Sequence, residues 1–466
     1  MQFLEYLGAL FAASLLSGVN ARFTKFESFD TAFDLGNHLG SRSVYHEPKF
    51  VGMDNSFPEG CSIKQLHILQ RHGSRNPEGG SGTGMAGGID ALQNRLLNGS
   101  IPVDYSIPEN PFAFLKDWEP VIKVEDADAL SSSGRVQLFD MGRQVYEHYS
   151  ELFQDDLKYT VNCAAQDRVV ESANWYLMGM FGREYANRTN VLYMAEDDSA
   201  GFNSLSSYYA CPTYETSSPD PEIVEKVHDT WRGIFLKAPR ERLSGFLKGY
   251  NLTDKDVRNL FSICQYEIAL KDESEFCNLF TPTDVLNFEY DNDLDFAYWG
   301  GPAASYEGKI LGAAYVNSVA EQMRKLANGT LTEDDQQVFY GFTHDAQIIP
   351  VENALGFFPD INANGLPADR NPFFYSQKTS DFVPFAGNLL TEVFQCSDNK
   401  YYVRHLVNQQ VFPLTDCGFG PSGSSDGLCE LEAYLSSSVR SNYTLNGRNL
   451  YVDYCKSNAT TFIAEF

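Results

Sequence analysis

Four short runs of apolar and aromatic residues, bounded by polar segments, are typical of buried β-strands. Their length favours strands over helices. These runs occupy residues 64–70, 338–343, 388–394 and 400–407. The first ends at Arg71-His72-Gly73 and the second at His344-Asp345. The pattern therefore predicts a sheet in which two strands, far apart in sequence, each end at a histidine.

Helical spacing of apolar residues marks the segments between these strands. A capping sequence at 131–134 precedes one predicted helix, whose apolar positions are Val136, Phe139, Met141, Val145 and Tyr149. Another helix is expected to begin near Arg168, with inward positions at Val169, Ala173, Tyr176, Leu177 and Met180. Residues 221–300 are predicted to be mainly helical, with amphipathic stretches at 224–235 and 257–270.

Strands separated by helices predict an α/β fold. We expect a large domain with a central mixed β-sheet flanked by helices, and a smaller, mainly α-helical domain inserted in it. The expected boundaries assign residues 22–150 and 310–466 to the α/β domain and residues 151–309 to the helical insert. In such folds ligands bind at the carboxyl edge of the sheet, where the two histidines are expected.

The first residues predict a cleaved signal peptide. An apolar run at 7–16 is followed by small residues up to Ala21, which suits cleavage after Ala21 and gives a signal peptide of residues 1–21. The run is too short to span a bilayer. Glu5 and the lack of Lys or Arg before the run are unusual, so a buried N-terminal helix is the alternative. The signal peptide predicts a secreted protein with no membrane association after cleavage.

Composition and charge narrow the classes of function. The 466 residues are 43% hydrophobic, which supports a well-buried core and excludes intrinsic disorder. The formal net charge of −27 argues against a nucleic-acid partner, which requires a broad basic surface. An anionic small molecule remains compatible with this charge, because a few local arginines can outweigh a distant negative field.

Cysteines and glycosylation sequons agree with secretion. None of the nine cysteines forms a C-x-x-C pair, which weakens zinc-binding and thioredoxin-like interpretations. In an oxidising compartment most should pair, and the odd count leaves at least one thiol over. Six sequons occur, at Asn98, Asn187, Asn251, Asn328, Asn442 and Asn458.

The segment 71–77 carries the clearest chemical signal. Arg71 and Arg75 place two guanidinium groups on either side of His72, and guanidinium groups match the oxygens of a phosphate bidentately. Their positive charge lowers the pKa of His72, which keeps one ring nitrogen nucleophilic in mild acid. Gly73 and Pro77 allow the tight turn after the strand.

Two further signals complete this chemistry. Asp345 is a carboxylic acid that can protonate a leaving oxygen and then act as a base towards water. His344 could add a donor to a phosphate, and Arg168 lies at a helix start, where a phosphate oxygen is also favoured. For Arg168 a structural salt bridge is the alternative.

Together these motifs resemble the histidine acid phosphatase family. The resemblance rests on Arg-His-Gly-x-Arg-x-Pro at 71–77, His344-Asp345, Arg-Val-x-x-Ser-Ala at 168–173, Ser-x-Phe-Cys-x-Leu-Phe at 274–280 and Cys396. It is closest to secreted fungal acid phosphatases and their phytase relatives. The implied fold is phosphoglycerate mutase-like, and the implied activity is hydrolysis of phosphate monoesters by a phosphoric monoester hydrolase.

The resemblance also implies a role for each motif residue. His72 would be the nucleophile that forms a phosphohistidine, and Asp345 the proton donor. The phosphate-binding residues would be Arg71, Arg75, Arg168 and His344. No metal and no cofactor is implied. The implied disulfides are Cys61–Cys396, Cys211–Cys455, Cys264–Cys277 and Cys417–Cys429, which leaves Cys163 as the odd thiol.

Departures from the family pattern bear on the substrate. Many relatives carry an additional arginine where this chain has Asn162-Cys163, and no basic cluster follows Arg75. This favours a secreted acid phosphatase of broad specificity, located outside the cell, in the periplasmic space or in the cell wall. A phytase is the alternative, followed by a non-catalytic secreted anion-binding glycoprotein. A phosphoryl-transfer mutase is disfavoured by secretion. Relatives often form dimers or larger assemblies, so a homo-oligomer is compatible.

The remaining histidines and two motif matches receive no functional role. His67 is expected to be a core histidine, because its side chain has the opposite strand parity to His72. His38, His46, His148, His228 and His405 have no companion pattern. The G-x-S-x-G match at 423–427 lacks the strand and helix of a serine hydrolase, and 291–295 lacks the glycine of a calcium loop, so both are expected to be loops.

Overall fold

A central β-sheet is the framework of the computed structural model, which describes residues 33–457 except 49, 51, 80–83, 198–201, 218–220, 333 and 362–364. The expected signal peptide and the sequon at Asn458 lie outside the described residues. Seven strands follow one another in the order β3-β2-β4-β1-β5-β6-β7, and β8 pairs with β6. Their bounds are β1 Cys61–Arg71, β2 Tyr159–Ala164, β3 Thr189–Met194, β4 Val338–Thr343, β5 Asn388–Cys396, β6 Tyr401–Val407, β7 Gln410–Phe412 and β8 Cys429–Glu430.

The sheet is mixed, as expected. Strands β3, β2, β4 and β1 run parallel, whereas β5 pairs antiparallel with β1 and β6 antiparallel with β5. The register of β1 against β4 places Arg71 beside Thr343. The residues that follow both strands, His72 and His344, therefore leave the sheet at the same edge.

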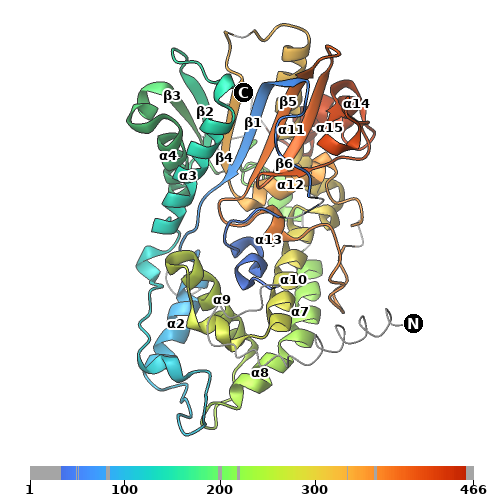
Figure 1. Cartoon of the computed structure of the whole chain (residues 1–466). Coiled ribbons are helices and arrows are strands. Elements are labelled where there is room, and N and C mark those ends of the chain that lie inside the picture. Colours follow the sequence, from blue (N-terminus) through green and yellow to red (C-terminus); the bar gives the residue numbers. More distant parts are fainter. Residues whose placement is uncertain are drawn as a thin grey trace, which may run out of the picture.

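Two groups of helices pack with the sheet (Figure 1). One group is α3 and α4, which contact each other; the other is α11, α12 and α15, which also pack together. Short helices α5, α6, α13 and α14 connect these elements. The bounds are α3 Ser132–His148, α4 Asp167–Phe181, α5 Tyr185–Arg188, α6 Pro212–Ser217, α11 Ser305–Ala327, α12 Asp345–Leu355, α13 Thr379–Phe382, α14 Leu431–Ser436 and α15 Ser441–Cys455.

A second, mainly helical part lies at one end of the sheet (Figure 1) and has its own apolar core. Its helices are α2 Met85–Leu97, α7 Pro221–Phe235, α8 Lys237–Ser244, α9 Asp254–Lys271 and α10 Pro282–Trp299. Thr253 and Thr281 form capping boxes at the starts of α9 and α10. The short 3-10 turn Gly40–Arg42 contacts α9 and α10, which brings the N-terminal segment to this part of the molecule.

The expected domain boundaries do not match this arrangement. Residues 159–164 and 189–194 were assigned to the helical insert, but they form β2 and β3 of the central sheet. In the other direction, α2 was assigned to the α/β domain, whereas Ile89 and Leu92 belong to the helical core. Both strands are short and fully or half buried, so no alternation of polar and apolar residues distinguishes them from helix.

Helices α3 and α4 meet through glycines. A Cβ on Gly142 would collide with the backbone oxygen of Tyr176, and one on Gly179 with that of Phe139. The inward positions expected for α4 are all buried, which confirms them. In α3, the apolar residue Val136 is 60% exposed, whereas Leu138 and Gly142 lie on the packed face.

Four disulfides form, in the pairs that the resemblance implied. Cys61–Cys396 joins β1 to its neighbour β5, and Cys211–Cys455 joins the segment before α6 to the end of α15. Cys264–Cys277 and Cys417–Cys429 close local loops. Cys163 is a buried free thiol on β2.

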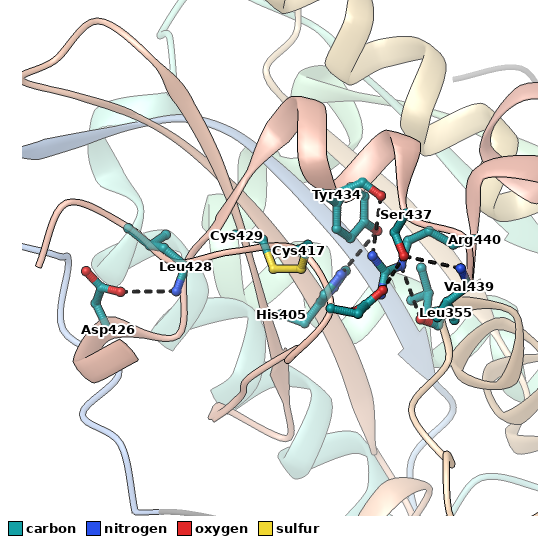
Figure 2. The surroundings of a disulfide bond; sticks show 11 residues. Leu355, His405, Cys417, Asp426, Leu428, Cys429, Tyr434, Ser437, Val439 and Arg440 are labelled. Atoms are coloured by element: carbon teal, nitrogen blue, oxygen red, sulfur yellow. Dashed lines mark hydrogen bonds and ion pairs between the residues drawn. A yellow bond between two sulfur atoms is a disulfide. The ribbon is translucent and has the colours of Figure 1, made fainter. Parts of the chain in front are cut away.

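His405, Tyr434 and Arg440 lie near the Cys417–Cys429 disulfide (Figure 2). His405 is buried and its ring contacts the hydroxyl groups of Tyr434, at 3.2 Å, and Thr391. Arg440 donates to the backbone oxygen of Leu355 at 3.2 Å. The neighbouring G-x-S-x-G match at 423–427 lies in a loop with a single 3-10 turn, as expected.

The expectation for residues 291–295 was wrong. They lie within α10 rather than in a loop. A capping box and Pro282 in the first turn start this helix. The side chains of Asp291 and Asp295 contact His228, and Asp293 accepts a hydrogen bond from Thr379. The local resemblance to a calcium loop could not predict a helix here, because the contacts of these acidic residues are to segments elsewhere in the chain.

The contact between α3 and α4 generates a stability prediction. Gly142→Ala should lower the free energy of unfolding by about 1–3 kcal/mol, because the added methyl group forces the two helices apart. Gly233→Ala in α7 is the matched control, since a Cβ there meets nothing within 4 Å and alanine favours a helix. Urea unfolding of both variants measures the difference, and equal stabilities would contradict the close helix contact.

Candidate active site

The carboxyl end of β1 fixes the position and tautomer of His72. Its backbone N–H donates to the carbonyl of Thr343 at 3.1 Å, across the β1–β4 pair. Its ring Nδ1 lies 2.9 Å from the carbonyl oxygen of Gly73 and so carries the proton. Nε2 is then the ring nitrogen with a free lone pair. The side chain is 1% exposed, which holds it in this orientation.

Burial and positive charge keep the His72 ring neutral. Burial is the largest effect, and the guanidinium groups of Arg71, Arg75 and Arg168 add to it, so the pKa of His72 lies well below its usual value. His344, whose ring centroid is 5.6 Å away, acts in the same direction. The ring therefore remains unprotonated in mild acid.

Three arginines lie close enough to this ring for their charges to lower its pKa. Arg71 and Arg75 come from the end of β1 and the turn after it, and Arg168 comes from the first turn of α4. The Nε–H groups of all three are buried and have no hydrogen-bond partner among the described residues. An unpaired buried donor costs about 1–3 kcal/mol, which an anion that accepts these hydrogens would offset.

Arg71 also organises the backbone around the site. Its Nη1 donates to the carbonyl oxygens of Ser41 and Val383, and its Nη2 lies 2.6 Å from the carboxylate of Asp345. Its guanidinium group lies 4.8 Å from the ring centre of Phe385. Burial lowers the pKa of Arg71 to about 10, which still leaves it charged in acid.

Asp345 begins α12, directly after β4 and His344. Burial raises its pKa, but the charges of Arg71, Arg75 and His344 and the N–H of Ala346 outweigh this effect, so the net pKa lies below its usual value. In the absence of a ligand Asp345 is therefore ionised and paired with Arg71.

His344 is held by a glutamate that the motifs did not identify. Its Nε2 lies 2.7 Å from Oε1 of Glu196, in the segment after β3. Glu196 also accepts hydrogen bonds from the Ser206 hydroxyl and the Gln166 backbone N–H. Burial raises the pKa of Glu196, but the His344 and Ser206 contacts lower it below its usual value, which keeps it negatively charged.

Two acidic residues contact the arginines from the other side of the site. Glu78 forms an ion pair with Arg75, and its Oε1 lies 3.6 Å from Nη2 of Arg168. Asp128 lies 3.1 Å from Nη1 of Arg168 and accepts the Gly79 N–H. Arg168 thus forms the salt bridges that were the alternative to phosphate binding, while it also faces the site.

A cavity of about 250 Å³ is lined by most of these residues, but His72 itself is not among them. It is lined by five of the predicted site residues, Arg71, Arg75, Arg168, His344 and Asp345. It is also lined by residues that sequence reasoning missed, among them Arg42, Glu78, Tyr208, Tyr209, Asn292, Asp295 and Trp299. These come from four separate segments, and no local pattern marks them.

A second cavity of about 330 Å³ shares Arg42, Asn292 and Asp295 with the first. Its other charged residues come from α7, α9 and α10 and are Arg232, Lys255, Arg258 and Asp291. Arg232 is paired with Asp291 at 2.9 Å. A basic surface therefore adjoins the site, although none follows Arg75 in the sequence.

Histidines outside the site make structural contacts. His67 is fully buried, as expected of a core histidine, and its Nε2 lies 2.7 Å from Oε1 of Gln65. His228 contacts Asp291 at 3.0 Å. Within the described ranges, no group of three or more His, Cys, Asp or Glu is arranged to hold a metal ion, and no helix is long and apolar enough to cross a membrane.

Comparisons with known proteins agree with this geometry. The chain is 59% identical over 456 residues to "Thiamine-repressible acid phosphatase pho4" of Schizosaccharomyces pombe, covering 97% of each protein. It is 30% identical to "Phytase PHO112" of Candida albicans, covering 87% of this chain and 85% of that protein. Its fold is similar to the crystal structure of the phytase from D. castellii, with a TM-score of 0.79 at 23% identity, covering 95% and 92% of the two chains.

The family itself follows from a match over most of the chain. Residues 62–408 match the model described as Histidine phosphatase superfamily (branch 2), a range that includes every predicted catalytic and phosphate-binding residue. Together with the acid phosphatase relatives, this shows that the chain belongs to branch 2 of the histidine phosphatase superfamily.

Proposed function

We propose that this protein is a secreted acid phosphatase that hydrolyses phosphate monoesters through a covalent phosphohistidine. The observation that carries the proposal is a neutral, buried His72 whose Nδ1 is bound to Gly73, beside three arginines with unpaired Nε–H groups. A phosphate placed among these arginines presents its phosphorus to Nε2 of His72. The names of the fungal relatives support the same activity.

In the first step, Nε2 of His72 attacks phosphorus as the bond from phosphorus to the ester oxygen breaks. Asp345 donates a proton to that oxygen, and the alcohol leaves. Arg71, Arg75, Arg168 and His344 stabilise the negative charge on the remaining phosphoryl oxygens.

In the second step, water attacks the phosphohistidine and the bond between phosphorus and Nε2 breaks. Asp345, now a carboxylate, accepts the proton from the water. The products are inorganic phosphate and neutral His72, so the enzyme returns to its starting state.

Acidic conditions suit both His72, the proposed nucleophile, and Asp345, the proposed proton donor. His72 remains neutral because its pKa is far below the usual value. Asp345 must be protonated to act as a donor, although Arg71 lowers its pKa in the free site. A bound phosphate neutralises Arg71 and raises the pKa of Asp345, so substrate binding itself favours the protonated donor.

A second candidate function is hydrolysis of phytate, which the adjoining basic cavity favours. Arg42, Lys255 and Arg258 could bind further phosphates of a polyphosphorylated substrate while one phosphate reacts at His72. Asp291 and Asp295 in the same cavity reduce its positive charge. This balance favours a phosphatase of broad specificity with activity on phytate over a dedicated phytase.

Secretion and glycosylation are part of the proposal. The four disulfides are typical of an oxidising compartment. The five sequon asparagines within the described residues are all exposed, as an attached glycan requires. The expected signal peptide supplies the route of export.

His72→Ala should reduce the kcat for p-nitrophenyl phosphate by at least about 1,000-fold at pH 4–5, because the covalent intermediate cannot form. The assay includes EDTA, and wild type should remain active in it. His148→Ala, an exposed position on α3, is the control and should retain activity. An inactive wild type, or an active His72→Ala variant, would contradict the proposed nucleophile.

Glu196→Gln tests how His344 is held. Loss of the carboxylate should raise the KM and weaken inhibition by inorganic phosphate by about 10-fold, because His344 loses a charge-assisted hydrogen bond. Glu184→Gln, at a surface site, should change neither constant. Unchanged phosphate inhibition in Glu196→Gln would assign Glu196 a purely structural role.

The basic cavity is tested by a double variant, Lys255→Ala with Arg258→Ala. Its kcat/KM for phytate should fall by about 10-fold, while that for p-nitrophenyl phosphate stays within about twofold, because only phytate reaches this cavity. Lys271→Ala, at the opposite end of α9, is the control. An equal loss on both substrates would indicate that the double variant disturbs the site rather than a separate phosphate contact.

A further inference from the structure

Each of the three arginines close to His72 already has a carboxylate partner. Arg71 is paired with Asp345, Arg75 with Glu78, and Arg168 with Glu78 and Asp128. Asp345 has a place in the proposed reaction as the proton donor. Glu78 has none, yet its carboxylate contacts two of the three arginines and lines the same cavity of about 250 Å³.

Glu78 lies where a phosphate has to bind if Arg75 and Arg168 hold its oxygens. A carboxylate and a phosphate both bind guanidinium groups through paired oxygens, so they compete for the same N–H donors. The Glu78 side chain is 50% exposed and follows Pro77 at the rim of the site, so it can move into solvent without disturbing buried residues. Asp128 differs, because it also accepts the backbone N–H of Gly79.

From this geometry we infer that Glu78 is an internal competitor for the phosphate, which sets the affinity of the site for phosphate and couples binding to proton uptake. Phosphate binding displaces its carboxylate from Arg75 and Arg168. The inference rests on the proposed function in one respect, which is that phosphate binds at these two arginines.

The charged groups that face Glu78 determine the direction of the coupling. Burial and the charge of Asp345 raise the pKa of Glu78. The charges of Arg75, Arg168 and Arg42 lower it by more, so the net pKa lies below its usual value. In the free site Glu78 is therefore ionised down to low pH. A bound phosphate takes up the arginine charges and adds a like charge, both of which raise the pKa of Glu78.

The sign of the pH dependence follows. Between the lower pKa of the free site and the higher pKa of the phosphate complex, binding takes up a proton at Glu78. Phosphate affinity therefore increases as the pH falls through this window. Below the window, Glu78 is protonated in both states and contributes no further change in affinity. The coupling adds to the acid preference that Asp345 produces.

Glu78→Gln should bind inorganic phosphate about 10-fold more tightly than wild type near pH 6, because the amide has no charge to compete with phosphate. The KM for p-nitrophenyl phosphate should fall in parallel. Calorimetric titration with inorganic phosphate in two buffers of different ionisation enthalpy should show less proton uptake in the variant. The gap between variant and wild type should shrink as the pH falls.

Two further variants keep the result interpretable. Glu147→Gln removes a carboxylate that pairs with Arg143 at 2.8 Å on the exposed face of α3, and should leave phosphate affinity unchanged. Glu78→Asp keeps the charge but shortens its reach, and should give an intermediate affinity; it also carries the test if Glu78→Gln does not fold.

Weaker or unchanged phosphate binding in Glu78→Gln, with wild-type proton uptake, would overturn the inference and show that Glu78 only positions Arg75. That outcome is distinct from failure of the proposed function. In the latter case wild type neither hydrolyses p-nitrophenyl phosphate nor binds phosphate, whereas failure of the inference alone leaves both properties of wild type intact.

Discussion

Three guanidinium groups, those of Arg71, Arg75 and Arg168, lie close to the ring of His72 in a site that water screens poorly. Like charges at such distances repel each other, and burial adds a desolvation cost. The surrounding structure offsets both costs by supplying carboxylates and backbone carbonyl oxygens. The same field keeps His72 neutral, so the feature that is costly to fold is the one on which the proposed nucleophilic role of this histidine depends.

The sheet explains how so much charge can be held in place. Arg71 is the last residue of a strand with paired neighbours on both sides, and its guanidinium donates to carbonyl oxygens from two distant segments. Arg168 is placed independently, by the packing of α4 against α3 through Gly142 and Gly179. Since each arginine is anchored by a different element, no single loop movement can relieve the repulsion. The site is therefore preorganised for an anion before one binds.

The helical part of the molecule adds a second level of control. It places Arg42, Asn292 and Asp295 where two cavities meet, next to the arginines from the sheet. In the proposed function, chemistry and selectivity belong to different parts of the chain. The sheet edge holds the reacting phosphate, and the helices contact the group attached to it. Acidic residues in both cavities limit the positive charge, in keeping with the overall charge of −27.

The sequence by itself determined the ends of β1 and β4, and with them the residues at 71–77 and 343–345, because these belong to local motifs with a physical reason for their spacing. It also determined the buried face of α4, which follows from helical periodicity. It could not assign β2 and β3, which are short and show no alternation of buried and exposed residues. Nor could it identify Glu196, Glu78 or Arg42. Glu196 and Arg42 act on residues more than 25 positions away, so only the tertiary structure brings them to the site. Glu78 is close to Arg75 in sequence, but its competition for the guanidinium groups depends on side-chain positions that leave no pattern along the chain.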